Sequence, residues 1–391
     1  MKLLYLTSES LSLDPIISSQ VVPLLVCIKS KLSPTLLTVE PYGFDLITKE
    51  AESGIKLSPL VRSNHPSYLL FLFLWLVVNG RQFDVIHVRS YLPMIATLAY
   101  KLFNHKVKVI FDPRGLFPEE LEYYSGKSIS SGVFKWLERY FIRYSDAVIA
   151  VSNSMADYFD AAYTGSASKI YFIPTFAQLA SADRLISVPN IRDDFGWQKE
   201  SLLCYSGSLE GWQCFEEIVN TFSLIRSRSS RIRFVFLSRS AEDMRMKISD
   251  RIPLDSYVVY SARPSELPHF LAQCDYGFLV RKPHIINRVA APIKVKDYLL
   301  AGLRLVVTSE VGDSSDFISD HDCGIVVDYK DISSGNINYA QFEEPVPISD
   351  KIRISQFAAT EFSLEMAVNK YLALYAALLL NHEGARAFTA R

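Results

Sequence analysis

The sequence predicts an α/β protein with two doubly wound parallel sheets. Short runs of Val, Ile, Leu and aromatic residues recur along the chain, and the stretches between them are long enough for a helix. Such runs are typical of parallel strands that are buried on both faces. The runs fall into two sets, and a length of 391 residues is enough for two or three domains, each with its own core. Alternating strands and helices in two sets therefore favour two doubly wound domains.

The expected strands follow one another in chain order. The first set comprises residues 3–6, 36–39, 85–88, 107–111, 147–151 and 170–173. The second set comprises residues 202–205, 232–237, 257–260, 276–280, 305–307 and 325–327. Apolar residues at spacings of three and four predict helices between them, for example over 133–143, 215–226 and 294–300.

The boundary between the two sets lies where periodicity is lost. Residues 174–196 gather Ser, Asp and Arg together with Pro189, as a linker does. We therefore expect an N-terminal domain over 1–183, a linker over 184–196 and a second domain over 197–362. The remaining segment, 363–391, begins with a helix that is capped by Ser363, carries apolar residues on most faces and must pack against something large. Its tail, 381–391, is expected to fray.

Composition excludes several classes of protein. Lys and Arg number 41 and Asp and Glu 42, so the net charge of -1 gives no general field for nucleic acid. The five cysteines show no CxxC spacing and are expected to be reduced, as in the cytoplasm. The seven His residues are scattered and no carboxylates cluster at ligand spacing, so no metal site is expected.

The longest apolar run, residues 68–78, has 11 residues. A helix needs roughly 20 apolar residues to span a bilayer, so no transmembrane segment is expected. We interpret the run as a helix buried on nearly all sides. The alternative is a peripheral membrane patch with exposed aromatic residues.

The richest polar segment follows the expected strand 276–280. Arg281 and Arg288 come after this strand, and Pro292 then opens a helix that holds Lys294 and Asp297 near its start. In open α/β sheets, ligands bind at this end of the strands, and a helix N-terminus there favours anions. A phosphate or diphosphate is the expected ligand. The alternatives are a solvated basic loop and, for Lys294 and Asp297, an exposed ion pair on one helix face.

The same segment carries a resemblance to a known family. Residues 292–302 have the pattern P-x-K-x-x-D-Y-x-x-x-G, and an apolar strand and Gly312-Asp313 follow. Residues 205–209 (YSGSL) with Trp212, 84–87 (DVIH), 146–154 (DAVIAVSNS), 173–174 and 362–363 continue the match over nearly the whole chain. In their order and spacing these motifs resemble the GT-B glycosyltransferases of family 4 type, also known as glycosyl transferases group 1.

The resemblance implies two Rossmann-like domains that face a central cleft. It implies that the second domain holds a nucleotide-sugar donor, that the first holds the acceptor, and that the final helix crosses back to the first domain. The donor is a substrate, so no cofactor is expected, and a helix N-terminus with basic side chains replaces a metal ion. The donor-binding residues implied here are Gly207, Ser208, Arg263, Arg281, Arg288, Pro292, Ile293, Lys294 and Asp297. Arg263 belongs to a loop near the nucleobase, although Ser265 is also expected to cap the next helix.

The chain departs from the family pattern at three positions. Val289 stands where the family usually has the first of two acidic residues, and Asp297 is the second. Ser208 and Gln213 stand near positions where the family usually has an Arg and a Lys. Because two unneutralised phosphates in a dry cleft are costly, we expect Arg281, Arg288 and Lys294 to supply the missing charge.

A polar turn follows the first domain's strand 107–111. Asp112, Arg114 and Glu119 lie in this turn and are candidates for acceptor binding or proton transfer, with Asp112 and Arg114 assigned to catalysis and Glu119 to the acceptor. The alternative is a tight turn in which Arg114 pairs with Glu119 or Glu120.

Three further residues are candidates for the same region. His87 ends the strand 85–88 and is a catalytic candidate, although a lone His is also a common interior residue. Asp14 and Gln20 follow the first strand, where the family usually has glycine-rich acceptor contacts, and are acceptor candidates. The family's glycines are absent there, which weakens any phosphate cradle.

We therefore expect a metal-independent glycosyltransferase that moves a sugar from a nucleotide-sugar to a hydroxyl of a glycan or lipid-linked oligosaccharide. The family implies retention at the anomeric carbon and a role in surface polysaccharide biosynthesis. The expected place is the cytoplasm, with the inner face of the membrane as an alternative. Two other functions stay open: a catalytically silent GT-B partner protein and a nucleotide-sugar epimerase of the same fold.

Overall fold

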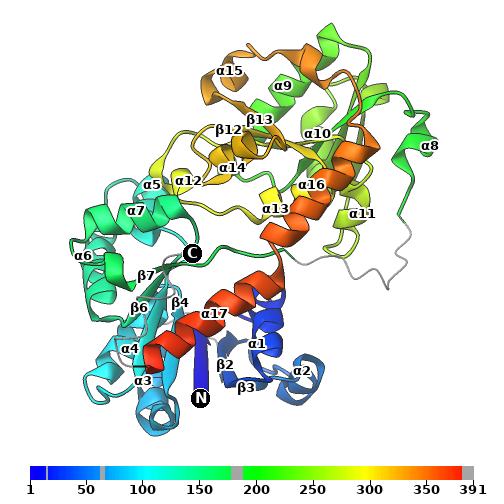
Figure 1. Ribbon diagram of the computed structural model, residues 1–391. Helices are drawn as coiled ribbons and strands as arrows, with labels where there is room; N and C mark the ends of the chain where they lie inside the picture. Colours follow the sequence, from blue (N-terminus) through cyan, green and yellow to red (C-terminus); the bar gives the residue numbers. More distant parts are fainter. Residues whose placement is uncertain (15, 62–66, 178–187, 381–391) are drawn as a thin grey trace. The chain divides into compact units, whose positions relative to one another are not determined.

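The computed structural model describes residues 1–14, 16–61, 67–177 and 188–380 (Figure 1). The chain divides into two compact units. The first holds residues 1–176 and the segment from Leu364 onward, and the second holds Ala177–Ser363. The first unit therefore ends earlier than the predicted boundary at 183. The predicted linker 184–196 lies partly outside the described residues, and its remainder contains a helix, α8 (Ile191–Phe195).

The first unit contains a seven-stranded parallel sheet in the order β3-β2-β1-β4-β5-β6-β7. Its strands are β1 (Lys2–Thr7), β2 (Ser33–Glu40), β3 (Lys56–Val61), β4 (Val85–Arg89), β5 (Lys108–Asp112), β6 (Ala147–Ala150) and β7 (Ile170–Phe172). Its helices are the π-helical turn η1 (Ile17–Val21), α1 (Val22–Ile28), α2 (Leu46–Ser53), α3 (Tyr68–Asn79), α4 (Leu92–Lys101), α5 (Phe117–Ser125), α6 (Ile129–Tyr144), α7 (Asn153–Ala162) and α17 (Leu364–Leu379).

The second unit contains a six-stranded parallel sheet in the order β10-β9-β8-β11-β12-β13. Its strands are β8 (Ser201–Ser206), β9 (Ile232–Leu237), β10 (Tyr257–Tyr260), β11 (Tyr276–Leu279), β12 (Arg304–Thr308) and β13 (Gly324–Val327). Besides α8, its helices are α9 (Phe215–Arg228), α10 (Ala241–Ile248), α11 (Leu267–Leu271), α12 (Ile285–Arg288), α13 (Ile293–Leu300), α14 (Ser314–Asp320), α15 (Tyr329–Ser334) and α16 (Ile348–Glu361). The two predicted parallel sheets are confirmed.

Strand β3 was not predicted from the sequence. Its apolar run is broken by Lys56 and Ser58, and it includes Pro59, which pairs with Thr38 of β2 at the edge of the sheet. A proline is tolerated on an edge strand because its missing N–H faces away from any partner strand. The strand therefore lacks the continuous apolar run by which its buried neighbours were recognised.

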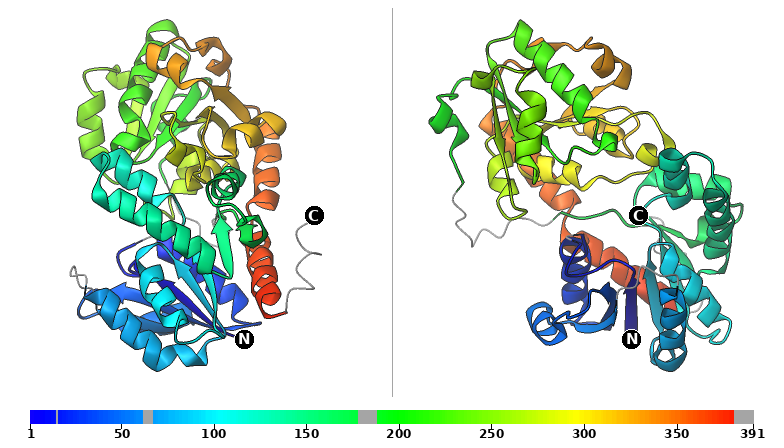
Figure 2. Two further views of the ribbon diagram at one scale, coloured as in Figure 1. Left: turned by 90° about the vertical axis from the view of Figure 1, so that its left-hand side faces the viewer. Right: turned by 180° about the vertical axis from the view of Figure 1, so that it is seen from behind.

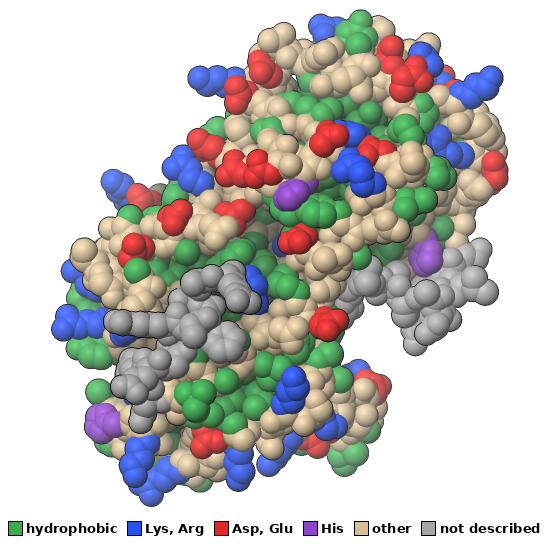
Figure 3. Space-filling model, viewed as in Figure 1, with side chains coloured by type: hydrophobic (Ala, Val, Ile, Leu, Met, Phe, Trp, Pro, Cys, Tyr) green, Lys and Arg blue, Asp and Glu red, His purple; other side chains and the backbone are tan. Residues whose placement is uncertain are grey.

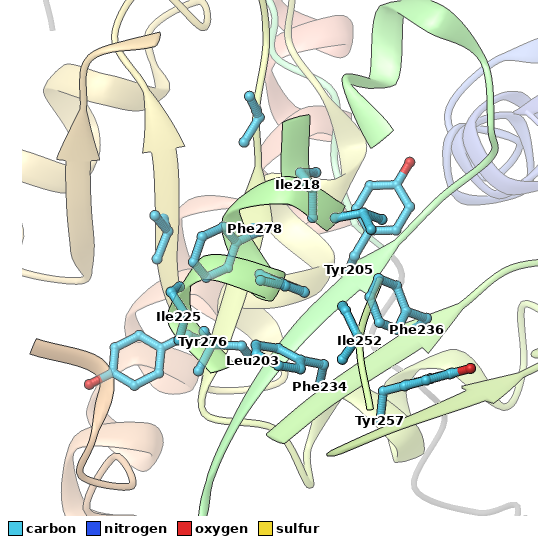
Figure 4. Packing of buried hydrophobic residues seen from close by; sticks show 14 of the residues in the cluster. Leu203, Tyr205, Ile218, Ile225, Phe234, Phe236, Ile252, Tyr257, Tyr276 and Phe278 are labelled. Carbon is cyan, nitrogen blue, oxygen red and sulfur yellow. The ribbon is translucent and has the colours of Figure 1, made fainter. Parts of the chain in front are cut away.

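The cores explain why each sheet folds around its own helices. In the first unit, α17 contributes Ala367, Tyr371, Leu374 and Tyr375 to the core that α1 and the sheet also form. Figures 1 and 2 show α17 beside α1, at the opposite end of the sequence. The final helix thus belongs to the first unit. In the second unit, Phe234 and Phe236 of β9 and Phe278 of β11 stand on the two strands that flank β8, and they pack against α9 (Figure 4).

Helix α3 corrects one prediction. It was expected to be buried on nearly all sides, yet only Leu72 and Leu76 are buried. Leu70, Phe71, Leu74, Val77 and Val78 are exposed. The run is apolar all round, yet α3 packs mainly against α4 and buries one narrow stripe only, which apolar composition alone does not report. No helix among the described residues is both long and apolar enough to cross a membrane.

Candidate functional site

The second sheet has a topological switch point between β8 and β11, which are neighbours that lead to opposite edges. Gly207 follows β8, and Arg281 comes shortly after β11. Ligands of doubly wound sheets bind at the carboxyl ends of the strands at such a point. The two segments that the sequence singled out therefore meet where the fold favours a ligand.

Lys294 reaches this point from the first turn of α13. Its Nζ donates to Gln213 Oε1 at 2.5 Å and lies 5.3 Å from the centroid of the Tyr205 ring. A Cβ at Gly207 would clash with the same Nζ and with the Tyr205 hydroxyl. A side chain at Gly207 would therefore have to displace the ammonium group, which is the end of a flexible side chain.

Arg281 lies beside Lys294 and is almost fully buried. Its Nη1 donates to Gln213 Oε1 at 3.0 Å and to the Trp212 carbonyl at 2.9 Å, and the guanidinium lies 4.4 Å from the centroid of the Trp212 ring. Gln213 Oε1 therefore accepts from both cations. A neutral amide holds two positive groups together without neutralising either.

Burial and like charge shift the pKa values at this site. Burial, reinforced by the nearby Arg281, lowers the pKa of Lys294 to about 7. Burial raises the pKa of Asp297 to about 6, although Lys296 and Lys294 oppose the shift. The Asp297 carboxylate has no hydrogen-bond or ion-pair partner among the described residues. The exposed Lys294–Asp297 ion pair considered from the sequence is therefore not formed.

A cavity of about 290 Å³ lies next to these residues, at the carboxyl ends of β8, β9 and β10. Its lining includes Gly207 and Ser208 and is completed by residues 206, 237–240, 262, 264 and 267. The volume is near the lower end of those typical of small-molecule pockets. The cavity and the two cations thus share the loop that follows β8.

The other predicted donor residues take several positions. The Ser208 carbonyl accepts from Tyr205 Oη at 2.6 Å, which shapes the same loop. Pro292 is the N-cap of α13 and Ile293 is its first residue, as the helix start predicted. Arg288 lies apart from Gln213, is half exposed and pairs with Glu310 at 3.1 Å.

Arg263 is exposed. Its guanidinium pairs with Glu266, and its backbone N–H donates to a Glu266 carboxylate oxygen at 2.8 Å. The predicted cap, Ser265, is wrong, because α11 starts at Leu267 with Glu266 as its N-cap. Pro268 near the start of that helix places the cap one residue later than the serine suggested.

In the first unit, three predicted catalytic residues come together at the carboxyl ends of β4 and β5. His87 Nε2 lies 3.3 Å from Asp112 Oδ2, and Arg114 Nη1 lies 3.5 Å from Asp112 Oδ1. The His87 Nδ1 lies 2.8 Å from Tyr375 Oη of α17. Arg114 has a φ of 65°, so the turn holds it in the left-handed region. The alternative pairing of Arg114 with Glu119 or Glu120 is wrong.

Within the cluster of His87, Asp112 and Arg114, the positive charge of Arg114 offsets the negative charge of Asp112. Burial opposes the ionisation of Asp112, yet Arg114 and His87 lower its pKa to about 2. Burial lowers the pKa of His87, although Asp112 opposes the shift. The Asp112 carboxylate is therefore ionised, and Arg114 compensates its charge.

The predicted acceptor residues have structural partners. Glu119 accepts from Lys135 Nζ at 2.8 Å and from Tyr158 Oη at 2.5 Å. Gln20 is buried in η1 and donates to the Phe176 carbonyl at 2.9 Å. The Asp14 carboxylate accepts from the Ile16 N–H at 2.8 Å. These three side chains do not join the His87 cluster in a hydrogen-bond network.

Sequence reasoning missed several residues of both sites. Tyr371 and Tyr375 stand one turn apart on α17, and their rings lie 5.8 and 6.0 Å from the His87 ring. The sequence showed Gln213 only as a position where the family usually has a cation. It did not show that Gln213 accepts hydrogen bonds from Lys294 and Arg281. Spacing on α17 could have indicated the tyrosines, but only the fold indicates the role of Gln213. Within the described residues, His, Cys, Asp and Glu form no group of three suited to a metal ion.

Comparison with known proteins agrees with this geometry. Residues 36–180 match the family described as Glycosyltransferase Family 4. No curated protein sequence matches the chain. HepE of Anabaena, solved with UDP and glucose, has a TM-score of 0.67 at 12% identity and covers 96% of this chain and 100% of that one. The chain has the GT-B fold of glycosyltransferases.

Two further structures illustrate the range of this GT-B fold. Sucrose-phosphate synthase of Thermosynechococcus elongatus has a TM-score of 0.69 at 12% identity, over 97% of this chain and 99% of that one. A structure from Listeria monocytogenes that carries the name of a UDP-N-acetylglucosamine 2-epimerase has a TM-score of 0.60 at 10% identity, over 97% of this chain and 96% of that one. Such identities show the fold, and the site residues must indicate the chemistry.

Proposed function

We propose that this GT-B chain transfers a sugar from a nucleotide-sugar to a hydroxyl of a glycan or lipid-linked oligosaccharide, with retention at the anomeric carbon. The observation that carries the proposal is the pair of cations on Gln213. Lys294 and Arg281 lie beside Gly207 and a cavity, at the switch point of the second sheet. Both side chains donate to one neutral amide oxygen, an arrangement that an anionic ligand beside them would stabilise.

In this proposal the two cations hold the donor diphosphate. Lys294 and Arg281 would stabilise the charge that develops on the departing diphosphate, as Arg and Lys do in other phosphate sites. Asp297 would accept from the vicinal hydroxyls of a ribose. This role is supported by the carboxylate's lack of a hydrogen-bond or ion-pair partner among the described residues. HepE of Anabaena was solved with UDP and with UDP-glucose, and this favours a uridine donor for the test.

The acceptor would lie near the His87 cluster of the first unit. Asp112 ends β5, and His87 lies two residues before the end of β4, near the edge where a doubly wound sheet presents its functional side chains. The proposal includes a role in surface polysaccharide biosynthesis and a place at the cytoplasmic side of the cell. Metal-independence is also part of it, because Lys294 and Arg281 would replace the metal ion's charge.

A thermal-shift panel of nucleoside diphosphates and nucleotide-sugars tests the proposal. We expect one base to stabilise the wild-type chain, and Lys294→Ala and Asp297→Ala to weaken that stabilisation. Lys247→Ala is the matched control, because Lys247 is an exposed lysine of the same unit that pairs with Glu216. Absence of any shift would favour the silent-partner alternative over an enzyme. Interconversion of a nucleotide-sugar without an acceptor would favour an epimerase.

A further inference from the structure

Helix α6 carries a line of apolar and aromatic side chains on its outer side. They recur at spacings of three and four residues, so they share one face of the helix. Their exposed fractions are 90% for Ile129, 47% for Val133, 57% for Trp136, 38% for Tyr140 and 52% for Tyr144. We call these five residues the α6 stripe. Figure 2 shows α6 along the side of the first unit that faces the viewer in the left panel.

The α6 stripe is not part of the core. The buried residues of α6 include Glu138, Phe141 and Ile142, which stand on the opposite side of the helix. The stripe's rings pack on one another instead, with 4.5 Å between the Trp136 and Tyr140 centroids and 6.1 Å between those of Tyr140 and Tyr144. A contiguous exposed patch of this kind marks an interaction site.

Positive charge accompanies the stripe along one side. Arg139 and Arg143 are exposed and stand next to the stripe on α6. Together with Lys169 they line a cavity of about 420 Å³ at the end of the helix. Among the described residues, no carboxylate lies within ion-pair distance of these three cations. On the face of the molecule that Figure 3 shows, side chains of both signs of charge are present.

Lys169 fixes the end of the helix at this cavity. Its Nζ donates to the carbonyls of Arg143 and Ser145, at 2.8 and 3.2 Å. The Arg143 guanidinium lies 5.8 Å from the centroid of the Tyr144 ring, so one of the two exposed arginines stands directly beside the stripe. The neighbouring α3 surface differs, because α3 exposes apolar side chains but contains no charged residue.

We propose that the α6 stripe docks the protein on an anionic phospholipid surface. Trp and Tyr side chains prefer the headgroup level of a bilayer, where the ring is apolar and the polar tip stays wet. Arg139 and Arg143 are placed to pair with lipid phosphates as the stripe enters the interface. A protein partner would not need cations confined to one side of an aromatic line. The proposal is independent of the transferase chemistry and can be tested without substrate.

Vesicle flotation of the full chain tests the docking surface. We expect binding to vesicles of phosphatidylcholine with phosphatidylglycerol, and about tenfold weaker binding to phosphatidylcholine alone. Trp136→Ser with Tyr140→Ser is expected to abolish binding to both. Arg139→Ala with Arg143→Ala is expected to remove the preference for the anionic vesicles and to leave the weak binding.

A matched control comes from α3. Phe71→Ser with Val78→Ser removes two side chains that are 61% and 78% exposed, and should leave vesicle binding unchanged. All six substituted side chains are exposed, so thermal unfolding should show folded variants. Loss of binding in the α3 variant but not in the α6 variant would overturn the proposal. Failure of the wild-type chain to bind either vesicle would do the same.

Two other occupants of the stripe have distinct outcomes. Dimerisation of the wild-type chain that the Trp136→Ser and Tyr140→Ser variant abolishes would show a second copy on α6, and would contradict lipid docking. Inorganic phosphate that displaces the vesicles more strongly than chloride of equal ionic strength would indicate a small-anion site at the cavity instead. Equal displacement by the two salts is the result that lipid docking predicts.

Discussion

At the carboxyl edge of the first sheet, Asp112 lies between His87 and Arg114, whereas at the second, Lys294 and Arg281 share the neutral amide of Gln213. The first cluster contains both signs of charge and is fully buried at His87 and Asp112. The second contains two cations on one neutral amide, and the Asp297 carboxylate, which has no hydrogen-bond or ion-pair partner among the described residues, acts electrostatically on Lys294. Similar folds thus hold one site built around a carboxylate and one built around two cations.

The difference indicates what each site is suited to bind. In the first cluster, the opposite charges of Asp112 and Arg114 offset part of each other's desolvation cost. Two buried cations that share a neutral amide are costly to bury and gain from an incoming anion. The charge that costs stability in the second unit is therefore the charge that would bind a diphosphate.

Removing the buried carboxylate of the first unit should have the largest effect on stability. Asp112→Asn leaves Arg114 without its partner, and breaking a buried pair costs about 3 kcal/mol or more. Urea unfolding at pH 7 should show this loss for the first unit. Asp160→Asn on the exposed side of α7 is the control and should change little. Unaltered stability of Asp112→Asn would mean that the first cluster is not compensated by Asp112.

The corresponding change in the second unit should have the opposite sign. Asp297 has its pKa raised to about 6, so its contribution to stability is present at low pH and is lost as pH rises through 6. Asp297→Asn should therefore raise the free energy of unfolding by about 1–2 kcal/mol at pH 8, and by about half of that at pH 5. Urea unfolding of the variant and the wild type at both pH values measures the difference. If Asp297→Asn were less stable than the wild type at pH 8, the two carboxylates would not have opposite effects on stability, and the contrast between the two sites would be wrong.

Donor affinity should depend on pH through Lys294. Its pKa is lowered to about 7, and a bound diphosphate favours the charged form and raises this pKa again. Binding then takes up a proton above pH 7, so affinity for a nucleoside diphosphate should fall by up to about tenfold per unit from pH 7 to pH 9. Lys294→Arg keeps its charge over this range and should show a flatter profile. Parallel profiles for the two proteins would remove Lys294 from the explanation.

The smallest expected effect concerns the contact between α17 and β4. Tyr375→Phe removes the hydroxyl that lies 2.8 Å from His87 Nδ1, which should cost about 1 kcal/mol of stability. The urea midpoint should fall without a change in nucleotide binding, because the second unit is untouched. A weaker nucleotide affinity in this variant would show that the two sites are coupled.

The sequence predicted the parts of the fold that repeat a simple pattern. All predicted buried strands of both sheets form, because continuous apolar runs suit parallel strands that are covered on both faces. The edge strand β3 was not predicted, because its half-exposed residues and Pro59 break that pattern. The exposure of α3 was not predicted either, because a helix can be apolar all round and still bury a single stripe.

The sequence predicted which residues of α13 belong to the candidate site, but not the side-chain hydrogen bonds that they make. Pro292, Lys294 and Asp297 follow from a helix start after a strand and from the family motif. The sharing of Gln213 between two cations depends on side-chain geometry across three loops, which spacing does not encode. The separation of Arg288 from Gln213 has the same origin, because Glu310 attracts it from the loop after β12.

Titration calorimetry of UDP and the other nucleoside diphosphates against the wild-type chain and Lys294→Glu tests the central claim most directly. The account predicts binding of one diphosphate by the wild-type chain, and affinity about 100-fold weaker after the charge reversal. Lys247→Glu should leave the affinity within a few-fold of the wild-type value. Equal affinity of the wild-type chain and Lys294→Glu would contradict the claim that the two cations on Gln213 form the diphosphate site.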